Sequence, residues 1–274
     1  MSSRISHQLI ASCLSLVSWV TLAKDVLEFP IELEFKDEPC IVKVSTIEGD
    51  IEVEGYEGDV ILLKADGDFD EDRPRFAPKG WHVSQDGNSV DIHFGALSDL
   101  DHLSLKLPYK SNVAVSLVDG DISLRELSGE FEISSKDGDL EMTDMSGSVI
   151  ANTVDGDVEL SISEVVSDEF FISLNTLDGD IELELPVDIQ ANLSAMTFDG
   201  EIDIDDEFRR PVPKSSNFES GDGIKIPKVP KAPTPPFPPI RIRNIDNIRQ
   251  IHLNGGGSIV ELHTVDGDIE VRVY

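Results

Sequence analysis

Aspartates recur in pairs around a glycine, and these repeated carboxyl groups are the part of the sequence best suited to chemistry. The sequence Asp-Gly-Asp stands at residues 119–121, 137–139 and 155–157, so the pair returns every 18 residues. Two carboxyl groups near one bond can hydrolyse a glycoside, and rows of carboxylates can bind cations. The candidate site residues are therefore Asp119, Asp121, Asp137, Asp139, Asp155 and Asp157.

The sameness of the repeats argues against catalysis at these aspartates. A general acid and a general base need two carboxyl groups whose environments separate their pKa values. The Asp-Gly-Asp unit also has a structural explanation, because glycine adopts positive φ and aspartate caps its own turn. We therefore predict that the protein is not an enzyme. The alternative is a polysaccharide-active β-solenoid enzyme.

No other pattern in the sequence specifies a cofactor or a tight metal site. The histidines after residue 23 lack the spacing of a zinc site, and no glycine-rich phosphate loop is present. Cys40 is predicted to be a small buried residue rather than a reactive thiol. We expect no cofactor, and only weak, distributed binding of Ca²⁺ or Mg²⁺ along the six candidate aspartates.

Short strands and tight turns must hold these aspartates in place. Glycine recurs every nine residues from Gly120 to Gly156, and Ser-Gly at 128–129 and 146–147 alternates with Asp-Gly-Asp. Apolar residues stand two and four positions after each glycine, which is the period of a β-strand. The residues predicted to point inward are Ile122, Leu124, Phe131, Ile133, Leu140, Met142, Val149, Val158 and Leu160. Those predicted to point outward are Ser123, Glu132, Glu141 and Glu159.

The predicted fold is all-β, a β-solenoid of stacked coils of about 18 residues. No long amphipathic helix could cover a single sheet, so the sheet must cover itself. Each coil would lay one strand on each of two facing sheets, with Asp-Gly-Asp turns along one edge and Ser-Gly turns along the other. The alternative is a twisted antiparallel meander or sandwich, because Asp-Gly also forms hairpin turns.

The chain divides into four parts. Residues 1–23 have the polar start, apolar run and small-residue end of a signal peptide. Residues 24–207 form the β-strand-repeat domain. Residues 208–250 form a Pro-rich basic loop, with nine of the fifteen prolines and nine basic against three acidic residues. Residues 251–274 return to the repeat and supply the final strands of the same domain.

The charge of the chain limits its partners. A formal net charge of -32 disfavours nucleic acid. The apolar run of residues 9–22 is too short to predict a membrane span, so we expect none after signal cleavage. The expected location is exported: periplasmic, cell envelope or extracellular. The expected partner is an unidentified envelope or surface component, either protein or polysaccharide.

The Gly-Asp-Ile-x-Val/Leu units resemble the bacterial β-strand-repeat family called "putative adhesins". The resemblance covers residues 41–204 and 257–273. Members of this family are exported or membrane-associated, and no catalytic residues come with the resemblance. It implies an exported, non-enzymatic scaffold or adhesin-like surface protein. A further alternative is an envelope assembly or stress component that uses its Pro-rich arm as a peptide ligand.

Overall fold

The computed structural model describes residues 26–35, 38–68, 81–95, 99–163, 170–209 and 248–273. The predicted signal peptide and residues 210–247 of the predicted Pro-rich loop lie outside the described residues. Within the described ranges the chain forms strands β1 to β19 and one 3-10 helix, η1 (Asp206–Arg209). None of the helical structure there is long and apolar enough to cross a membrane.

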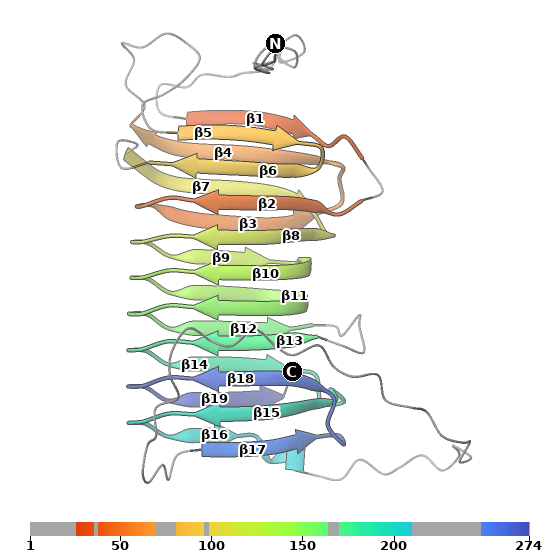
Figure 1. The fold of residues 1–274 in the computed structure, drawn as a ribbon, viewed down its shortest axis with the longest axis vertical. Helices are drawn as coiled ribbons and strands as arrows, with labels where there is room; N and C mark the ends of the chain where they lie inside the picture. The colour runs from red at the N-terminus through yellow and green to blue at the C-terminus, as the bar shows by residue number, and fades with distance from the viewer. Residues whose placement is uncertain are drawn as a thin grey trace, which may run out of the picture.

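The strands form two facing sheets that run the length of the molecule (Figure 1). Sheet A contains, in order of pairing, β1 (Val26–Glu32), β4 (Val60–Asp68), β7 (Asp99–Pro108), β3 (Asp50–Tyr56), β9 (Ile122–Arg125), the first part of β11 (Leu140–Asn152), β12 (Val158–Ile162), β14 (Ile181–Leu185), β19 (Ile269–Val273) and β16 (Ile202–Ile204). Sheet B contains β5 (Trp81–Asp86), β6 (Ser89–Phe94), β2 (Cys40–Ser45), β8 (Ser111–Ser116), β10 (Ser128–Ser134), the second part of β11, β13 (Phe171–Asn175), β18 (Ser258–His263), β15 (Ala191–Met196) and β17 (Ile248–Leu253).

The predicted β-solenoid is confirmed, because neighbouring coils pair in parallel along both sheets. In sheet B, Phe131 of β10 lies in register with Val113 of β8 on one side and Val149 of β11 on the other. The step from 131 to 149 is the 18-residue period of the sequence. Among the described strands, antiparallel pairs occur only near the two ends of the stack, where β1, β4 and β5 lie at one end and β17 at the other. The alternative of an antiparallel meander is therefore wrong.

The order of coils in the stack differs from their order in the sequence at both ends. Strands β2 and β3 lie between the coil β6–β7 and the coil β8–β9. Strands β18 and β19, the last in the chain, lie between β13–β14 and β15–β16, as the blue strands in Figure 1 show. The end of the chain therefore completes an interior coil rather than extending the stack.

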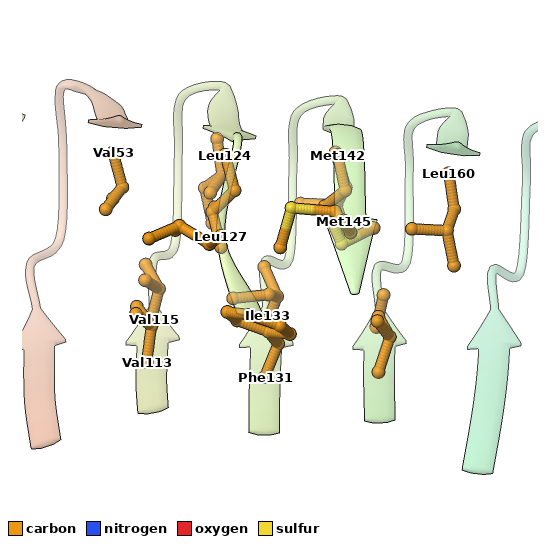
Figure 2. Packing of buried hydrophobic residues seen from close by; sticks show 14 of the residues in the cluster. Val53, Val113, Val115, Leu124, Leu127, Phe131, Ile133, Met142, Met145 and Leu160 are labelled. Atoms are coloured by element: carbon orange, nitrogen blue, oxygen red, sulfur yellow. The ribbon is translucent and has the colours of Figure 1, made fainter. Parts of the chain in front are cut away.

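The core is the narrow space between the two sheets, and the predicted register is correct. All nine residues predicted to point inward are buried. Glu132, Glu141 and Glu159 are exposed, and Ser123 is partly exposed. The core also receives Leu127 and Met145 from the corners where the chain passes from sheet A to sheet B (Figure 2). Both corners follow a residue with positive φ, Glu126 or Asp144, which the sequence analysis did not identify.

Separate groups of side chains close the two ends of the core. At the β1 end, Trp81 stacks between Phe29 and Phe94, with ring centroids 6.0 and 6.2 Å apart. At the other end, Phe208 of η1 is buried beneath the last coil. These side chains, together with antiparallel edge strands, shield core residues that have no further coil to cover them.

Cys40 is buried inside sheet B, as predicted. Its Sγ lies 3.0 Å from the hydroxyl of Ser111. Burial raises the pKa of the thiol, more than the hydrogen bond between the Cys40 and Ser111 side chains lowers it. Since the thiolate is the reactive form, this cysteine is held in its unreactive state.

Candidate functional site

The Asp-Gly-Asp turns align along one side of the solenoid, which we call the turn edge. The first acidic residue of each turn forms a parallel bridge with its equivalent in the next coil. In stacking order these residues are Glu48, Asp119, Asp137, Asp155, Asp178, Asp266 and Asp199. The backbone of each turn is hydrogen-bonded to both neighbouring coils. The N–H of Gly138, for example, donates to Asp155 O at 2.9 Å, and the N–H of Asp137 donates to Val118 O at 3.0 Å.

The second aspartate of each turn forms a hydrogen-bonded row, the aspartate ladder. One carboxylate oxygen of each aspartate accepts the backbone N–H of the equivalent residue in the next coil. The N–H of Asp139 donates to Asp121 at 2.9 Å, and the N–H of Asp157 donates to Asp139 at 2.8 Å. The ladder ends at the N–H of Glu201 and comprises Asp50, Asp121, Asp139, Asp157, Asp180 and Asp268. Each carboxylate thus supplies a charge-assisted bond that joins two coils.

A row of buried threonines lies beneath the turn edge. The hydroxyl of each donates to a glycine carbonyl of the adjacent coil at 2.9 to 3.2 Å. These threonines are Thr153, Thr176, Thr264 and Thr197, and each is at most 6% exposed. Because a buried hydroxyl without a partner is costly, these bonds fix the position of each coil relative to the next.

The structure brings all six candidate aspartates to the turn edge and separates them into two rows. Asp119, Asp137 and Asp155 belong to the bridging row, and Asp121, Asp139 and Asp157 belong to the aspartate ladder. All six are exposed. The ladder gives three of them a structural role in joining coils. Among the described residues no group of three or more His, Cys, Asp or Glu side chains is arranged to hold a metal ion. Weak, distributed cation binding stays a prediction.

A second acidic row runs beside the ladder on the outer face of sheet A. Its members lie in register on successive strands: Glu141, Glu159, Glu182, Glu270 and Asp203. An open groove of about 370 Å³ lies partly between this row and the aspartate ladder, and Asp139, Glu141, Asp157 and Glu159 contribute to its lining. Glu141 and Glu159 lie on the outer face, as predicted, but the row that they form with Glu182, Glu270 and Asp203 was not predicted. Glu141 and Glu159 each stand three residues after the glycine of an Asp-Gly-Asp turn, and this equal spacing in the sequence could have predicted the row.

Among the described residues, basic side chains pair with acids on either side of Glu141 and Glu159 along sheet A, but not with these two glutamates. At one end Arg125 pairs with Glu52, and Lys106 Nζ lies 2.8 Å from Glu54 Oε2. The hydrogen bond from Lys106 holds the pKa of Glu54 below its ordinary value. At the other end Arg272 contacts Glu182 and Glu270. Glu141 and Glu159 are therefore neighbouring acids without an ion pair in the part of the chain that the structure describes.

Glu159 is the carboxyl group that this arrangement affects most clearly. Its pKa is raised above the ordinary value, first by partial loss of hydration and then by repulsion from Glu182, Glu141, Asp157 and Asp139. A repeated acidic face explains this shift without a catalytic partner. The neighbours that raise the pKa are all acidic, and each belongs to one of the two rows.

Replacing this carboxyl group should stabilise the fold at neutral pH. Because the folded state holds the proton of Glu159 more tightly than the unfolded chain does, ionisation weakens the fold as pH rises through its titration range. Glu159→Gln should therefore raise the stability at pH 7 by about 0.2–1 kcal/mol, the usual size of a cross-strand charge effect. In acid the wild-type Glu159 is already protonated, so the gain in stability from Glu159→Gln should disappear at about pH 3.

Thermal melts of the two proteins at both pH values measure this difference. Glu132→Gln is the matched control, because Glu132 is also exposed on a strand but its register neighbours are Ala114 and Ile150. The explanation fails if Glu159→Gln and Glu132→Gln behave alike, or if the gain from Glu159→Gln is the same at both pH values.

The histidines in the described part of the chain do not converge on one site. His93 contacts Ser45 at 2.7 Å, His252 contacts Asn192 at 2.7 Å, and His263 contacts Asn175 at 3.1 Å, all on the outer face of sheet B. His102 lies on sheet A, 3.6 Å from Glu52. Burial lowers the pKa of His263, so its ring favours the neutral form. These contacts are those of strand residues pairing with polar neighbours.

Comparison with known proteins gives a match for part of the chain. Residues 98–223 match the model of the Toastrack DUF4097 family. A solved structure of a "putative cell adhesion protein" from Clostridium sporogenes is similar over 90% of this chain and 99% of its own, with 14% sequence identity and a TM-score of 0.49. No curated protein matches the chain. The Toastrack match agrees with the expected β-repeat class of protein, and it falls on coils of the solenoid from β7 to β16.

Proposed function

We propose that the protein is an exported, non-enzymatic scaffold whose long acidic faces recognise an envelope or surface partner, either protein or polysaccharide. The observation that carries this proposal is the aspartate ladder. Each coil repeats the same hydrogen-bonded carboxylate, so the carboxyl groups form an extended exposed edge. An extended surface suits binding to a large partner, as the concave faces of other solenoids do.

The glutamate row on sheet A supports the same proposal. Among the described residues no basic side chain is paired with Glu141 or Glu159. Such an acidic face favours partners that carry positive charge, and it would speed their encounter at low ionic strength.

Export is tested by expressing the full chain and separating cytoplasmic from exported fractions. The exported protein should begin at Lys24, which mass spectrometry of the intact chain measures directly. Cytoplasmic protein that keeps residues 1–23 would contradict export. A chain lacking residues 2–23 is the control that should stay in the cytoplasm.

Absence of catalysis is tested by incubating the purified protein with acidic polysaccharides and measuring new reducing ends. We expect none above buffer. Sustained release that Glu159→Gln abolishes and Glu132→Gln leaves intact would contradict the scaffold and favour the polysaccharide-active alternative. The pair is matched because both glutamates are exposed on strands of the solenoid.

A further inference from the structure

A stripe of exposed apolar side chains runs along the turn edge, directly beside the bridging row of acids. The residue before the first aspartate of each turn faces solvent, and in four successive coils it is apolar. These residues, which we call the apolar stripe, are Val154, Leu177, Val265 and Phe198, with exposures of 43, 50, 44 and 65%. In the next coil beyond Val154 the equivalent residue is Lys136, which interrupts the apolar run; the two coils after it again have exposed apolar residues, Val118 and Ile47, at 42 and 38%.

The apolar stripe is unusual for a surface so rich in charge. Each of its members is followed in sequence by an exposed aspartate: Asp155, Asp178, Asp266 and Asp199. Aligned apolar residues beside a row of carboxylates fit a partner that is both apolar and basic. Because the coils are parallel strands in register, both rows repeat at about 4.8 Å.

The topology brings one segment of this chain to the same edge. The strand β16 runs away from the turn edge, and the described chain stops after it at Arg209. The chain resumes at β17, whose first residue, Ile248, is in register with Met196. Met196 stands two residues before Phe198 of the apolar stripe. The segment 210–247 therefore connects Arg209, beyond the far end of β16, to Ile248, which lies beside the stripe.

The sequence of this segment contains the basic and apolar residues that would complement the carboxylates and the apolar stripe. Residues 225–233 read Lys-Ile-Pro-Lys-Val-Pro-Lys-Ala-Pro, three repeats of a basic, an apolar and a proline residue. A polyproline II helix has three residues per turn and a rise of about 3.1 Å, so the three lysines would share one face at intervals of about 9.3 Å. Two coil spacings of the solenoid are about 9.6 Å.

We propose that residues 225–233 dock on the apolar stripe of the same molecule as a polyproline II helix. Lys225, Lys228 and Lys231 then lie opposite every second carboxylate of the bridging row. Asp137, Asp178 and Asp199 span four coil spacings, about 19 Å. The three lysines span about 18.6 Å. Ile226 and Val229 cover apolar side chains between those carboxylates.

The chain on either side is long enough for this position. Fifteen residues join Arg209 to Lys225, and fourteen join Pro233 to Ile248. Fully extended, each could reach roughly 45–50 Å. The apolar stripe itself covers three coil spacings, about 14 Å.

Carbodiimide cross-linking of the full chain tests this proposal, because the reagent joins a lysine to a carboxylate only when they are in contact. The protein is cross-linked as an equal mixture of ¹⁴N and ¹⁵N copies, and the linked peptides are mapped by mass spectrometry. Lys225, Lys228 and Lys231 should link chiefly to the bridging row between Asp137 and Asp199. Both peptides of each linked pair should carry the same isotope.

Two variants separate docking from general charge attraction. Leu177→Ser should reduce these cross-links at least threefold, whereas Val187→Ser should not, although Val187 is equally exposed, at 48% against 50%. Exchanging the residues at 228 and 229, with Lys228→Val and Val229→Lys, keeps the composition but breaks the three-residue period. This exchange should also reduce the links. Unchanged melting temperatures would show that each variant is folded.

Three results would overturn the proposal. Links of mixed isotope would show contact between molecules rather than within one. Links spread over the carboxylates of both sheets, or no links at all, would show that the segment does not occupy the stripe. If Leu177→Ser and Val187→Ser change the yield of these cross-links equally, the apolar stripe does not bind the segment.

Discussion

Replacing Gly138 with alanine is expected to destabilise the protein by about 4 kcal/mol or more, which is exceptional for the addition of one methyl group. Gly138 has a φ of +133°, where residues with a side chain are strained by about 1–3 kcal/mol. A Cβ there would also lie 2.1 Å from the carbonyl oxygen of Gly120 in the adjacent coil. Neither backbone can move away without breaking the hydrogen bonds that join the turns. Urea unfolding measures the loss.

Gly255→Ala is the matched control for Gly138→Ala. Gly255 also has a positive φ, +103°, but a Cβ there would have nothing within 4 Å. It should show the conformational strain alone and lose clearly less stability. If the two substitutions cost the same, the close approach of stacked turns does not limit the fold, and the arrangement of the turn edge is wrong.

Removing residues 258–274 is expected to abolish the native structure of the last coils. This deletion takes out β18 and β19, which lie between β13–β14 and β15–β16. Among the side chains removed, Val260, Leu262, Ile269 and Val271 are at most 1% exposed. At about 1.5–3 kcal/mol for each buried side chain, the loss is roughly 6–12 kcal/mol, comparable with the whole stability of a domain.

Hydrogen exchange measures which strands lose protection in this deletion. Amides of β15 and β16 should exchange freely, although both strands precede the deleted residues in sequence. Removing residues 24–35 is the control, because β1 is an edge strand that pairs with β4 alone among the described strands. That deletion should leave β15 and β16 protected. Protection of β15 and β16 in the chain without 258–274 would show that the last coil is peripheral.

Much of the fold could be predicted from the sequence because the repeat is local. The nine-residue interval between glycines fixes the strand length, and alternation around Ile122, Leu124 and Phe131 fixes which face is buried. The order of the coils could not be predicted in this way. The turns at Asp178 and Asp266 have the same residue pattern as those at Asp137 and Asp155. The local sequence of β18 therefore does not specify that its neighbours are β13 and β15. That choice depends on contacts between residues far apart in sequence.

For the candidate site too, the sequence predicts the position of the residues but not their contacts. The position of the six aspartates along one edge follows from their period, and the structure places them there. The period does not reveal that Asp121 and Asp139 accept hydrogen bonds from the next coil, because that depends on the direction of the carboxylates. The apolar stripe was missed because Leu177 and Phe198 look like ordinary strand residues. Only the stacked turns show that they face solvent.

Pairs of engineered cysteines test whether β18 and β19, the last strands of the chain, complete an interior coil of the β-solenoid. Ser173, Glu261 and Ser194 lie in register on the outer face of sheet B, with Glu261 in the middle. With Cys13 and Cys40 replaced by alanine, Ser173→Cys with Glu261→Cys should form a disulfide, since adjacent strands place the two Cα atoms about 4.8 Å apart. Ser173→Cys with Ser194→Cys should not, because two strand spacings, about 9.6 Å, exceed the reach of a disulfide. A disulfide in the second pair and none in the first would show that β18 does not lie between β13 and β15.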